Sequence, residues 1–597
     1  MSRYRPFSSD RRALVKGLGA TAVTGPAFLF GRPARAEGGS LFTLGVASGD
    51  PAARSVVLWT RLAPDPLNGG GLRRPVVPVR WKVATDPGMR HVVRRGVAAA
   101  RADRGHAVTV VARGLPSNSW LYYQFSALGQ TSRIGRTRTF PGRFDRADRM
   151  RFGVANCQNY VQGAYPAYRD MLDQELDFVV HLGDYMYEGA AVSAPLIPGR
   201  NHNGGESVTV EDYRNRYALY RLDPDLQDAH AQFPFLVTWD DHEVDNNYAG
   251  LVPEDGQTDF ARRRRDAYRV YAETMPLRPR TRRGNRSGSL RLFRKLSFGN
   301  LADIHMLDTR QFRTDQPADD GFGSRDILDP AVEGLLEATF GETLFDPDGI
   351  EDPGATMLGA GQEMWLARNL RRSRARWNVL AQQVMQTEWN LRATGRLSVE
   401  AQLAAFPPDP ASQAQAQAIR QALGQVGEIL NVDAWDGYQA ARARLFGVLD
   451  ALRPNNPIVL TGDIHSAWAA NLRKDFANPA SDVLAAEFVA TSISSTFLAP
   501  DPRPTDFIVR ASLPDNPHID FFNALFRGYI VCDVDHRRWQ STYRAVGDIA
   551  QVGNTADPLA LLPRAGSPVA TDAVFEVDAG FNAPGNAQAL RTVFRRI

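Results

Sequence analysis

The sequence predicts a layered α/β enzyme domain preceded by a small antiparallel β sandwich. Three observations carry this prediction. Short β-type runs separated by turn residues fill residues 41–140, strands alternate with amphipathic helices beyond Arg151, and several apolar runs end in metal-ligand side chains. With 597 residues, 43% of them hydrophobic, the chain is long enough for two folded parts.

The amino-terminal residues resemble a twin-arginine export signal. Arg11 and Arg12 precede a mildly apolar stretch at 17–30, and Ala34-Arg-Ala36 is a small-residue processing site. Gly, Thr and Pro interrupt the apolar stretch, whereas a retained membrane span needs about 20 apolar residues. We therefore expect a signal peptide over 1–36, twin-arginine machinery as an export partner, no retained membrane span, and a periplasmic or secreted protein.

Charge and cysteine content limit the classes of protein to which the mature chain can belong. Removal of residues 1–36 leaves 63 Lys/Arg against 65 Asp/Glu, so the chain has no overall basic balance of the kind expected for a nucleic-acid binder. The two cysteines allow at most one disulfide. Cys532 lies in an alternating strand-like run and is expected to be a buried thiol, while Cys157 directly follows a strand.

The expected elements follow in order along the chain. A first module at 37–145 contains strand candidates at 55–59, 79–83, 107–111, 121–125 and 134–140. A polar, turn-rich stretch at 141–148 separates it from a larger domain at 150–560. That domain has strand candidates at 151–155, 178–182, 235–239, 301–307, 457–461 and 487–491, and helix candidates at 166–174, 210–219, 360–374 and 437–452. Residues 561–597 are expected to be a carboxyl-terminal extension.

The residues at the strand ends of the larger domain are the candidates for metal binding and catalysis. Open α/β folds gather their functional groups at the carboxyl edge of the sheet. The residues that follow the predicted strands are, in order, Cys157, Asp184 with Tyr187, Asp240-Asp241-His242, Asp308 with Arg310, and Asp463 with His465. Each of these alone is compatible with a turn or a buried core residue, but their combination predicts a hydrolytic metal centre.

The ligand types indicate which metals the centre holds. A thiolate, a phenolate, a carboxylate and an imidazole together suit ferric iron, and the carboxylates of Asp184, Asp241 and Asp463 suit calcium or magnesium. Asp184 could bridge two ions. A structural zinc site is disfavoured because Cys157 has no cysteine neighbour in the sequence. The run Asp308-Thr-Arg310 is explained about equally well by a salt bridge between Asp308 and Arg310 beneath the site and by phosphate binding.

Several motifs together resemble a known family. They are ASGDP at 47–51, LWTR at 58–61, ANCQ at 155–158, LDTRQ at 307–311 and ATSIS at 490–494. The sequence resembles the PhoD-type alkaline phosphatases, a branch of the metallophosphoesterase superfamily, from the export signal to near the carboxyl terminus. The resemblance implies a metallophosphoesterase sandwich of two central sheets flanked by helices, preceded by an immunoglobulin/fibronectin-like β sandwich.

The resemblance also implies a ligand set. It places Fe3+ on Cys157, Asp184, Tyr187 and His465, and one or two Ca2+ ions on Asp184, Asp241 and Asp463. Asp240 and Asp241 are both candidate ligands, and the resemblance favours Asp241. The runs DDHE at 240–243 and GDIH at 462–465 replace amide and imidazole donors of the wider superfamily by carboxylates, which favours calcium over zinc or manganese.

These observations predict an exported alkaline phosphatase that hydrolyses phosphate esters with a metal-bound hydroxide at a mixed iron/calcium centre. His242 is the candidate catalytic residue, as proton donor or hydrogen-bond donor to the phosphoryl group, and Arg310 is a candidate substrate-binding residue. One alternative keeps the fold and makes the protein a phosphodiesterase or phospholipase D-like hydrolase. Another is an exported binding protein that has lost its activity.

Overall fold

The computed structural model describes a large part of the chain. The described residues are 40–254, 256–278, 290–317, 322–324, 350–389, 409–410, 413–414, 417, 429–497, 502, 506, 509–510, 512–547, 569–580 and 590–592. The expected signal peptide at 1–36 lies outside them, as does most of the expected extension at 561–597. The chain divides into two compact units, 1–38 and 39–597, and the described residues all belong to the second unit.

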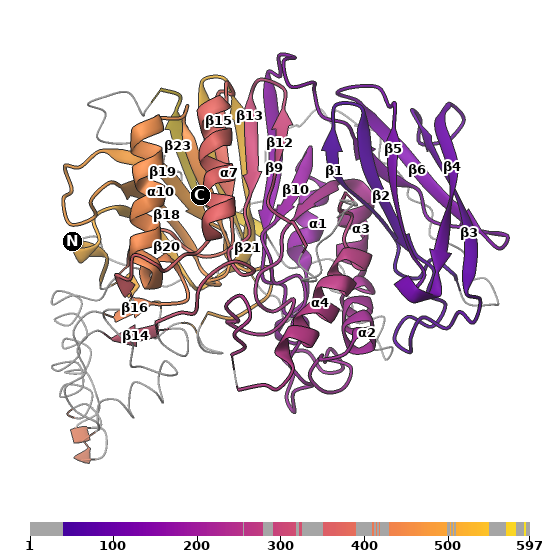
Figure 1. Cartoon of the computed structure of the whole chain (residues 1–597), viewed down its shortest axis with the longest axis horizontal. Helices are drawn as coiled ribbons and strands as arrows, with labels where there is room; N and C mark the ends of the chain where they lie inside the picture. The colour runs from indigo at the N-terminus through magenta and orange to yellow at the C-terminus, as the bar shows by residue number, and fades with distance from the viewer. Residues whose placement is uncertain are drawn as a thin grey trace, which may run out of the picture. The chain divides into compact units, whose positions relative to one another are not determined.

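A ten-stranded mixed sheet forms the first layer of this unit (Figure 1). Its order is β24-β23-β22-β21-β9-β10-β11-β1-β2-β5. In that order the bounds are Leu590–Thr592, Val569–Asp578, Arg538–Val546, Arg527–Asp535, Arg149–Ala155, Phe178–His181, Pro234–Val237, Val46–Ala52, Ser55–Arg61 and Ala107–Arg113. Strands β9, β10, β11 and β1 run parallel, and the remaining pairs are antiparallel.

A seven-stranded sheet forms the second layer. Its order is β12-β13-β15-β17-β19-β18-β20, with bounds Arg294–Phe298, Ala302–Met306, Trp377–Ala381, Pro457–Thr461, Val483–Val489, Ala467–Arg473 and Ile519–Asn523. Buried side chains of both sheets make one core, in which the rings of Phe152 and Phe178 stack at 4.8 Å and Trp377 lies 5.8 Å from Trp539. The two sheets therefore pack face to face, as the family resemblance implies.

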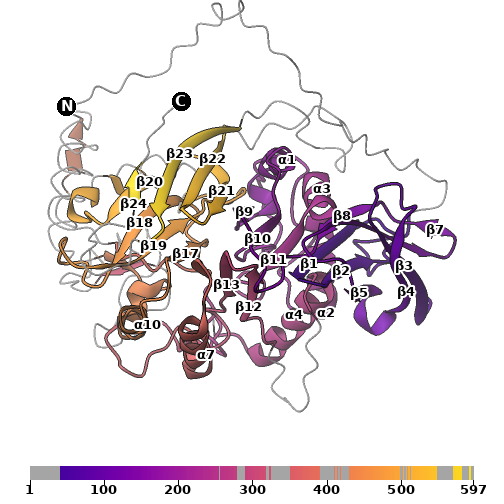
Figure 2. The ribbon, with the colours of Figure 1, turned by 90° about the horizontal axis from the view of Figure 1, so that it is seen from above.

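Helices cover the outer faces of the two sheets (Figure 2). Those packed on the ten-stranded sheet are α1 (Pro166–Leu172), α2 (Val210–Arg221), α3 (Pro224–Gln232) and α4 (Phe260–Thr274), and those on the seven-stranded sheet are α7 (Gly359–Arg372) and α10 (Gln439–Leu452). Local sequence sets two of the starts: Thr209 and Asp212 form a capping box on α2, and Asp223 caps α3 ahead of Pro224.

The amino-terminal module is a sandwich that shares a layer with the larger domain. Its second layer is a sheet of β4 (Val92–Arg101), β3 (Val76–Ala84), β6 (Trp120–Ala127) and β7 (Gln130–Thr131), with β8 (Gly135–Arg138) paired to β6. Its first layer is β1, β2 and β5, and the two layers share one apolar core. Because β1 pairs in parallel with β11, the module is continuous with the ten-stranded sheet. The sequence alone did not predict this continuity, because a partner strand so distant in the chain cannot be seen in local patterning.

The smaller elements complete the described fold. Strands β14 (Phe322–Ser324) and β16 (Ile429–Asn431) pair with each other, and four 3-10 turns lie at Ala102–Arg104, Tyr160–Gln162, Trp435–Tyr438 and Leu513–Asp515. Strand β23 extends the ten-stranded sheet from within the range expected to be an extension. Among the helices of the described residues, none is both long and apolar enough to cross a membrane.

Candidate metal centre

The candidate ligands follow four strands whose carboxyl ends meet. Cys157 follows β9, Asp184 follows β10, and Asp240 with Asp241 follows β11 in the ten-stranded sheet, while Asp463 and His465 follow β17 in the other sheet. Cys157, Asp184, Asp463 and His465 all have positive φ, between 52° and 66°. That conformation is costly for residues with a side chain and concentrates at functional sites, so the chain turns sharply at these four candidate ligands.

Two glycines let the ligand loops approach one another closely. A Cβ on Gly183, which has φ of 118°, would lie 2.4 Å from the Cβ and 2.6 Å from the backbone nitrogen of Asp240. A Cβ on Gly462 would lie 2.9 Å from the Cβ of Asn156. Backbone bonds add to this contact, because the amide of Cys157 donates to the carbonyl of Gly183 at 3.1 Å. The spacing of the loops thus depends on the missing side chains.

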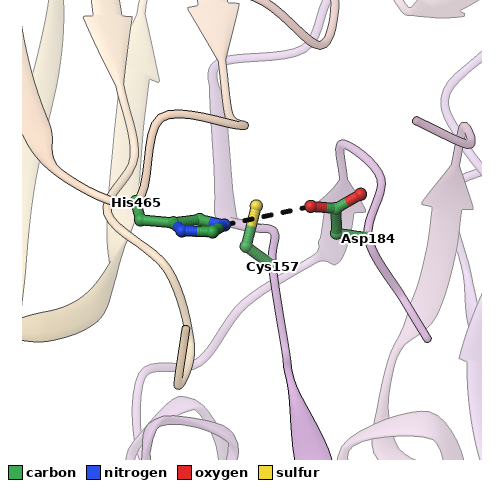
Figure 3. Close-up of side chains that lie close together, drawn as sticks. All are labelled: Cys157, Asp184 and His465. Carbon is green, nitrogen blue, oxygen red and sulfur yellow. Dashed lines mark ion pairs between the residues drawn. The ribbon is translucent and has the colours of Figure 1, made fainter. Parts of the chain in front are cut away.

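Three overlapping groups of ligand atoms result. They are Cys157 with Asp184 and His465, Asp184 with Asp241 and His242, and Asp240 with Asp241 and Asp463, and within each group the ligand atoms lie within 4.8 Å of one another. Figure 3 shows the first group, in which His465 Nε2 lies 4.0 Å from Asp184 Oδ2 and the thiol of Cys157 points into the same space. Asp184 and Asp241 each belong to two groups, so adjoining cations could share them.

The phenol of Tyr187 joins the first group. Its oxygen lies 3.0 Å from Asp184 Oδ2, 3.1 Å from His465 Nε2 and 2.7 Å from the hydroxyl of Ser495. The backbone of Tyr187 is held in turn, because its amide donates to the hydroxyl of Tyr220. All seven predicted ligand residues are therefore assembled at one place: Cys157, Asp184, Tyr187, Asp240, Asp241, Asp463 and His465.

One side of this cluster is accessible. Cys157 is completely buried and the side chain of Asp184 is 2% exposed, whereas those of His242, Asp463 and His465 are 19%, 18% and 22% exposed. A substrate can reach the cluster only where its groups are open to solvent, so the approach lies across these three side chains.

Arg310 is a buried cation that lies against the carboxylates of the cluster. Its guanidinium is completely buried and donates to both carboxylate oxygens of Asp433, at 2.7 Å each, and to Asp240. Asp241 and Asp463 lie at 3.6 and 3.5 Å from it. The predicted Asp308 partner instead accepts from the backbone amides of Arg310 and Gln311. Arg310 thus neutralises part of the carboxylate charge from beneath.

The electrostatic environment of the cluster is suited to binding metal cations. Burial, together with the neighbouring carboxylates, raises the pKa of Asp184 and of Asp463 well above the ordinary value and that of Asp240 to about 7. Burial and the charge of Asp184 likewise raise the pKa of the Cys157 thiol. Asp184 Oδ1 and Asp240 Oδ2 are buried without a hydrogen-bond partner among the described residues. Bound cations would satisfy these oxygens and favour the ionised forms, so the donors present fit the implied metals.

His242 is held at the edge of the cluster by Glu188. The Nδ1 atom of the imidazole lies 2.8 Å from Glu188 Oε2, and the ring packs on Tyr187 with 4.0 Å between centroids. Burial alone would lower the pKa of His242, but the carboxylates of Glu188, Asp184 and Asp241 raise it well above its ordinary value. Glu188 therefore fixes the ring and favours its protonated form.

Glu243 and Asp433 support the site without having been predicted as site residues. Glu243 accepts hydrogen bonds from the backbone amides of Asp184, Tyr185 and Asp240 and so ties two ligand loops together. The sequence could have indicated Glu243, because this residue is the last of the 240–243 run of candidate site residues. Asp433 follows β16, and nothing in its local sequence marks it as a partner of Arg310.

Comparison with known proteins agrees with this geometry. A sequence model of the PhoD-like phosphatase family matches residues 152–543, and a model described as its N-terminal domain matches residues 30–141. The chain is 42% identical over 517 residues to the protein named alkaline phosphatase D of Bacillus subtilis (strain 168), covering 86% of this chain and 79% of that one. It also matches the solved structure titled "Structure of PhoD" with a TM-score of 0.77 and 37% identity over 94% of each chain.

The two packed sheets, the ligand cluster and these matches define a phosphoesterase. The chain belongs to the PhoD-like phosphatase family. It is accordingly a phosphatase, and the family predicted from its motifs is confirmed.

Proposed function

We propose that the cluster is the active centre of an exported, metal-dependent alkaline phosphatase with a mixed iron/calcium centre. Cys157, Asp184, Tyr187 and His465 would hold Fe3+, and Asp184, Asp241 and Asp463, with Asp240, would hold one or two Ca2+ ions. The observation that carries the proposal is the sharing of Asp184 and Asp241 between the three ligand groups. When bound, the metals would supply Lewis acidity that activates water and neutralises charge on the phosphoryl group.

The side chains of the protein have distinct parts in this reaction. His242 stands on the open side of the cluster, and in its protonated form, which Glu188 favours, it would donate a proton to the phosphoryl or leaving-group oxygen. Its Nδ1 is engaged by Glu188, which leaves Nε2 for the substrate. Substrate binding by Arg310 stays a prediction, and its contacts with Asp240 and Asp433 support a role in placing the ligands.

Metal analysis combined with one conservative substitution tests the centre. Asp184→Asn keeps the shape of the side chain and removes its charge, so iron and calcium content by elemental analysis and phosphatase activity should fall together. In the unaltered protein, a chelator should abolish activity and calcium should restore it. Retention of full metal content by Asp184→Asn would contradict the shared-ligand assignment.

The two alternative functions, an inactive binding protein and a phosphodiesterase or phospholipase D-like hydrolase, are supported to different degrees. The cluster and the family support an enzyme over a binding protein that has lost its activity. Rates on paired monoester and diester chromogenic substrates decide between the phosphatase and a phosphodiesterase or phospholipase D-like hydrolase. A clear excess of diester hydrolysis would overturn the monoesterase proposal.

Export by the twin-arginine route to the periplasm or medium is supported by the Arg11-Arg12 pair and by the Ala34-Arg-Ala36 site. Sequencing of the mature amino terminus should find Glu37 first, and Arg11→Lys with Arg12→Lys should keep the protein inside the cell. Mature protein outside the cytoplasm despite both substitutions would contradict this route. An immunoglobulin/fibronectin-like origin of the amino-terminal module also stays a proposal.

A further inference from the structure

The charges of this chain are distributed unevenly between its two parts. Residues 37–145 contain 16 Lys/Arg and 6 Asp/Glu, whereas residues 146–597 contain 47 Lys/Arg and 59 Asp/Glu. The near-neutral total of the mature chain thus conceals a strongly basic amino-terminal module and an acidic larger domain. Such segregation orients a protein in the field of a charged partner.

Part of this basic charge lies on the outer face of the five-stranded sheet. None of the five strands β3, β4, β6, β7 and β8 contains an Asp or Glu. Burial alternates along β3 and β6, and most of the buried residues of these two strands belong to the core of the module. The register pairs Arg80 with Val97 and Lys82 with Arg95, so these side chains share the outward face.

Three of the outward cations have no acidic partner within the described part of the chain. Among the described residues, Arg80, Lys82 and Arg95 form no ion pair. Arg101, at the end of the same face, pairs with the exposed Asp103. We call the surface formed by Arg80, Lys82, Arg95, Val76 and Val97 the basic face. Figure 2 shows its strands β3 and β4 at the edge of the unit.

Exposed apolar side chains lie among these cations. Val97 is 64% exposed and Val76 is 44% exposed, and both are on the outward side by register. A soluble polyanion gains little from contact with valine, whereas a lipid interface gains from apolar contact and from basic residues at the same time. Base stacking is less well supported, because the Arg136 guanidinium covers the Trp120 ring at 3.5 Å.

We propose that the basic face docks the protein on an anionic lipid surface. Arg80, Lys82 and Arg95 would contact the lipid headgroups, while Val76 and Val97 would reach the interface. The acidic larger domain would be repelled by the same surface, which selects this orientation. The proposal is independent of the metal centre, since none of these residues belongs to it.

Vesicle sedimentation of the mature full-length protein tests the proposal. The protein should bind vesicles of phosphatidylcholine with about 30% phosphatidylglycerol and should not bind pure phosphatidylcholine. The triple variant Arg80→Gln, Lys82→Gln, Arg95→Gln should lower the partition coefficient on the order of 100-fold, from the contribution of three basic residues near the surface. Val97→Asn should lower it several-fold without any change in charge.

A matched control has the same charge change elsewhere. Arg262→Gln, Arg265→Gln, Arg371→Gln alters exposed residues of α4 and α7 and should bind vesicles like the unaltered protein. Hydrolysis of a soluble chromogenic substrate by both triple variants should equal that of the unaltered protein, which also verifies folding. Four results would each overturn the proposal. They are an equal loss of vesicle binding in the control variant, equal binding of the unaltered protein to both vesicle types, absence of binding to the anionic vesicles, and tighter binding to single-stranded oligonucleotide than to the anionic vesicles.

Discussion

The contact between Gly183 and Asp240 predicts a large effect from a single methyl group. In Gly183→Ala the new Cβ would lie 2.4 Å from the Cβ and 2.6 Å from the backbone nitrogen of Asp240, so the Asp240 loop has to move by roughly 1 Å to reach ordinary van der Waals contact. The positive φ of 118° adds strain of about 1–3 kcal/mol for a residue with a side chain.

A shift of that size acts on activity as well as on stability. Asp240 and Asp241 share the displaced loop with His242, and a misplacement of about 1 Å can cost on the order of 100-fold in rate. We therefore expect Gly183→Ala to lower kcat/KM about 100-fold and to reduce calcium content, with kinetics on a chromogenic monoester and elemental analysis as the assays.

Gly189→Ala is the matched control. Gly189 lies six residues further along the same loop, and a Cβ added there would meet no heavy atom of the described residues within 4 Å. It is also not among the glycines with positive φ. Its kcat/KM should stay within about twofold of the unaltered protein. If Gly183→Ala kept full activity and metal content, close packing of the two loops would not be what sets the spacing of the ligands.

Charge and protonation lead to three further predictions. Glu188→Gln should leave metal content unchanged and move the alkaline loss of activity to lower pH, because Glu188 helps to raise the pKa of His242 and the protonated ring is the proposed donor; an unchanged pH profile would contradict this role. Burial raises the pKa of Asp520 to about 6 from 3.8, so the folded chain binds this proton more tightly than the unfolded chain. Stability should then fall as pH rises from about 4 to about 6, and Asp520→Asn should unfold at higher urea concentration at about pH 8 but not at about pH 4. Arg310→Met, which removes the bidentate partner of Asp433, should cost the metal-free protein about 3–5 kcal/mol, whereas Arg149→Met at an exposed ion pair should cost under about 1 kcal/mol by the same urea titration.

The candidate ligand residues could be named from the sequence because most of them lie just past an apolar strand. The run ending at Asp184 and the run ending at Asp463 both switch from buried aliphatic residues to polar donors at the strand end. Parallel strands bring their carboxyl ends to one edge, so proximity within the ten-stranded sheet also followed. That β17 also ends at this edge could not be predicted, because it depends on how two separate sheets pack.

The residues that hold the candidate ligands in place were harder to predict from the sequence than the candidate ligands themselves. Arg310 was assigned either to phosphate or to a salt bridge with Asp308, yet its buried guanidinium contacts Asp240 and Asp433. Asp433 lies 123 residues from Arg310, and no local pattern connects them. A buried ion pair is fixed by the whole fold, because only the fold decides which charges lose their water together.

The sequence by itself determined the alternation of strands and helices and the family, and it indicated the candidate ligands, since these depend on periodicity and on residue types within short runs. Tertiary structure alone decided that the amino-terminal module shares a sheet with the larger domain, that Asp184 and Asp241 each serve two ligand groups, and that Arg80, Lys82 and Arg95 gather on one face. Those features arise from strand register and sheet packing, which join residues that are distant in the chain and leave no trace in any single segment.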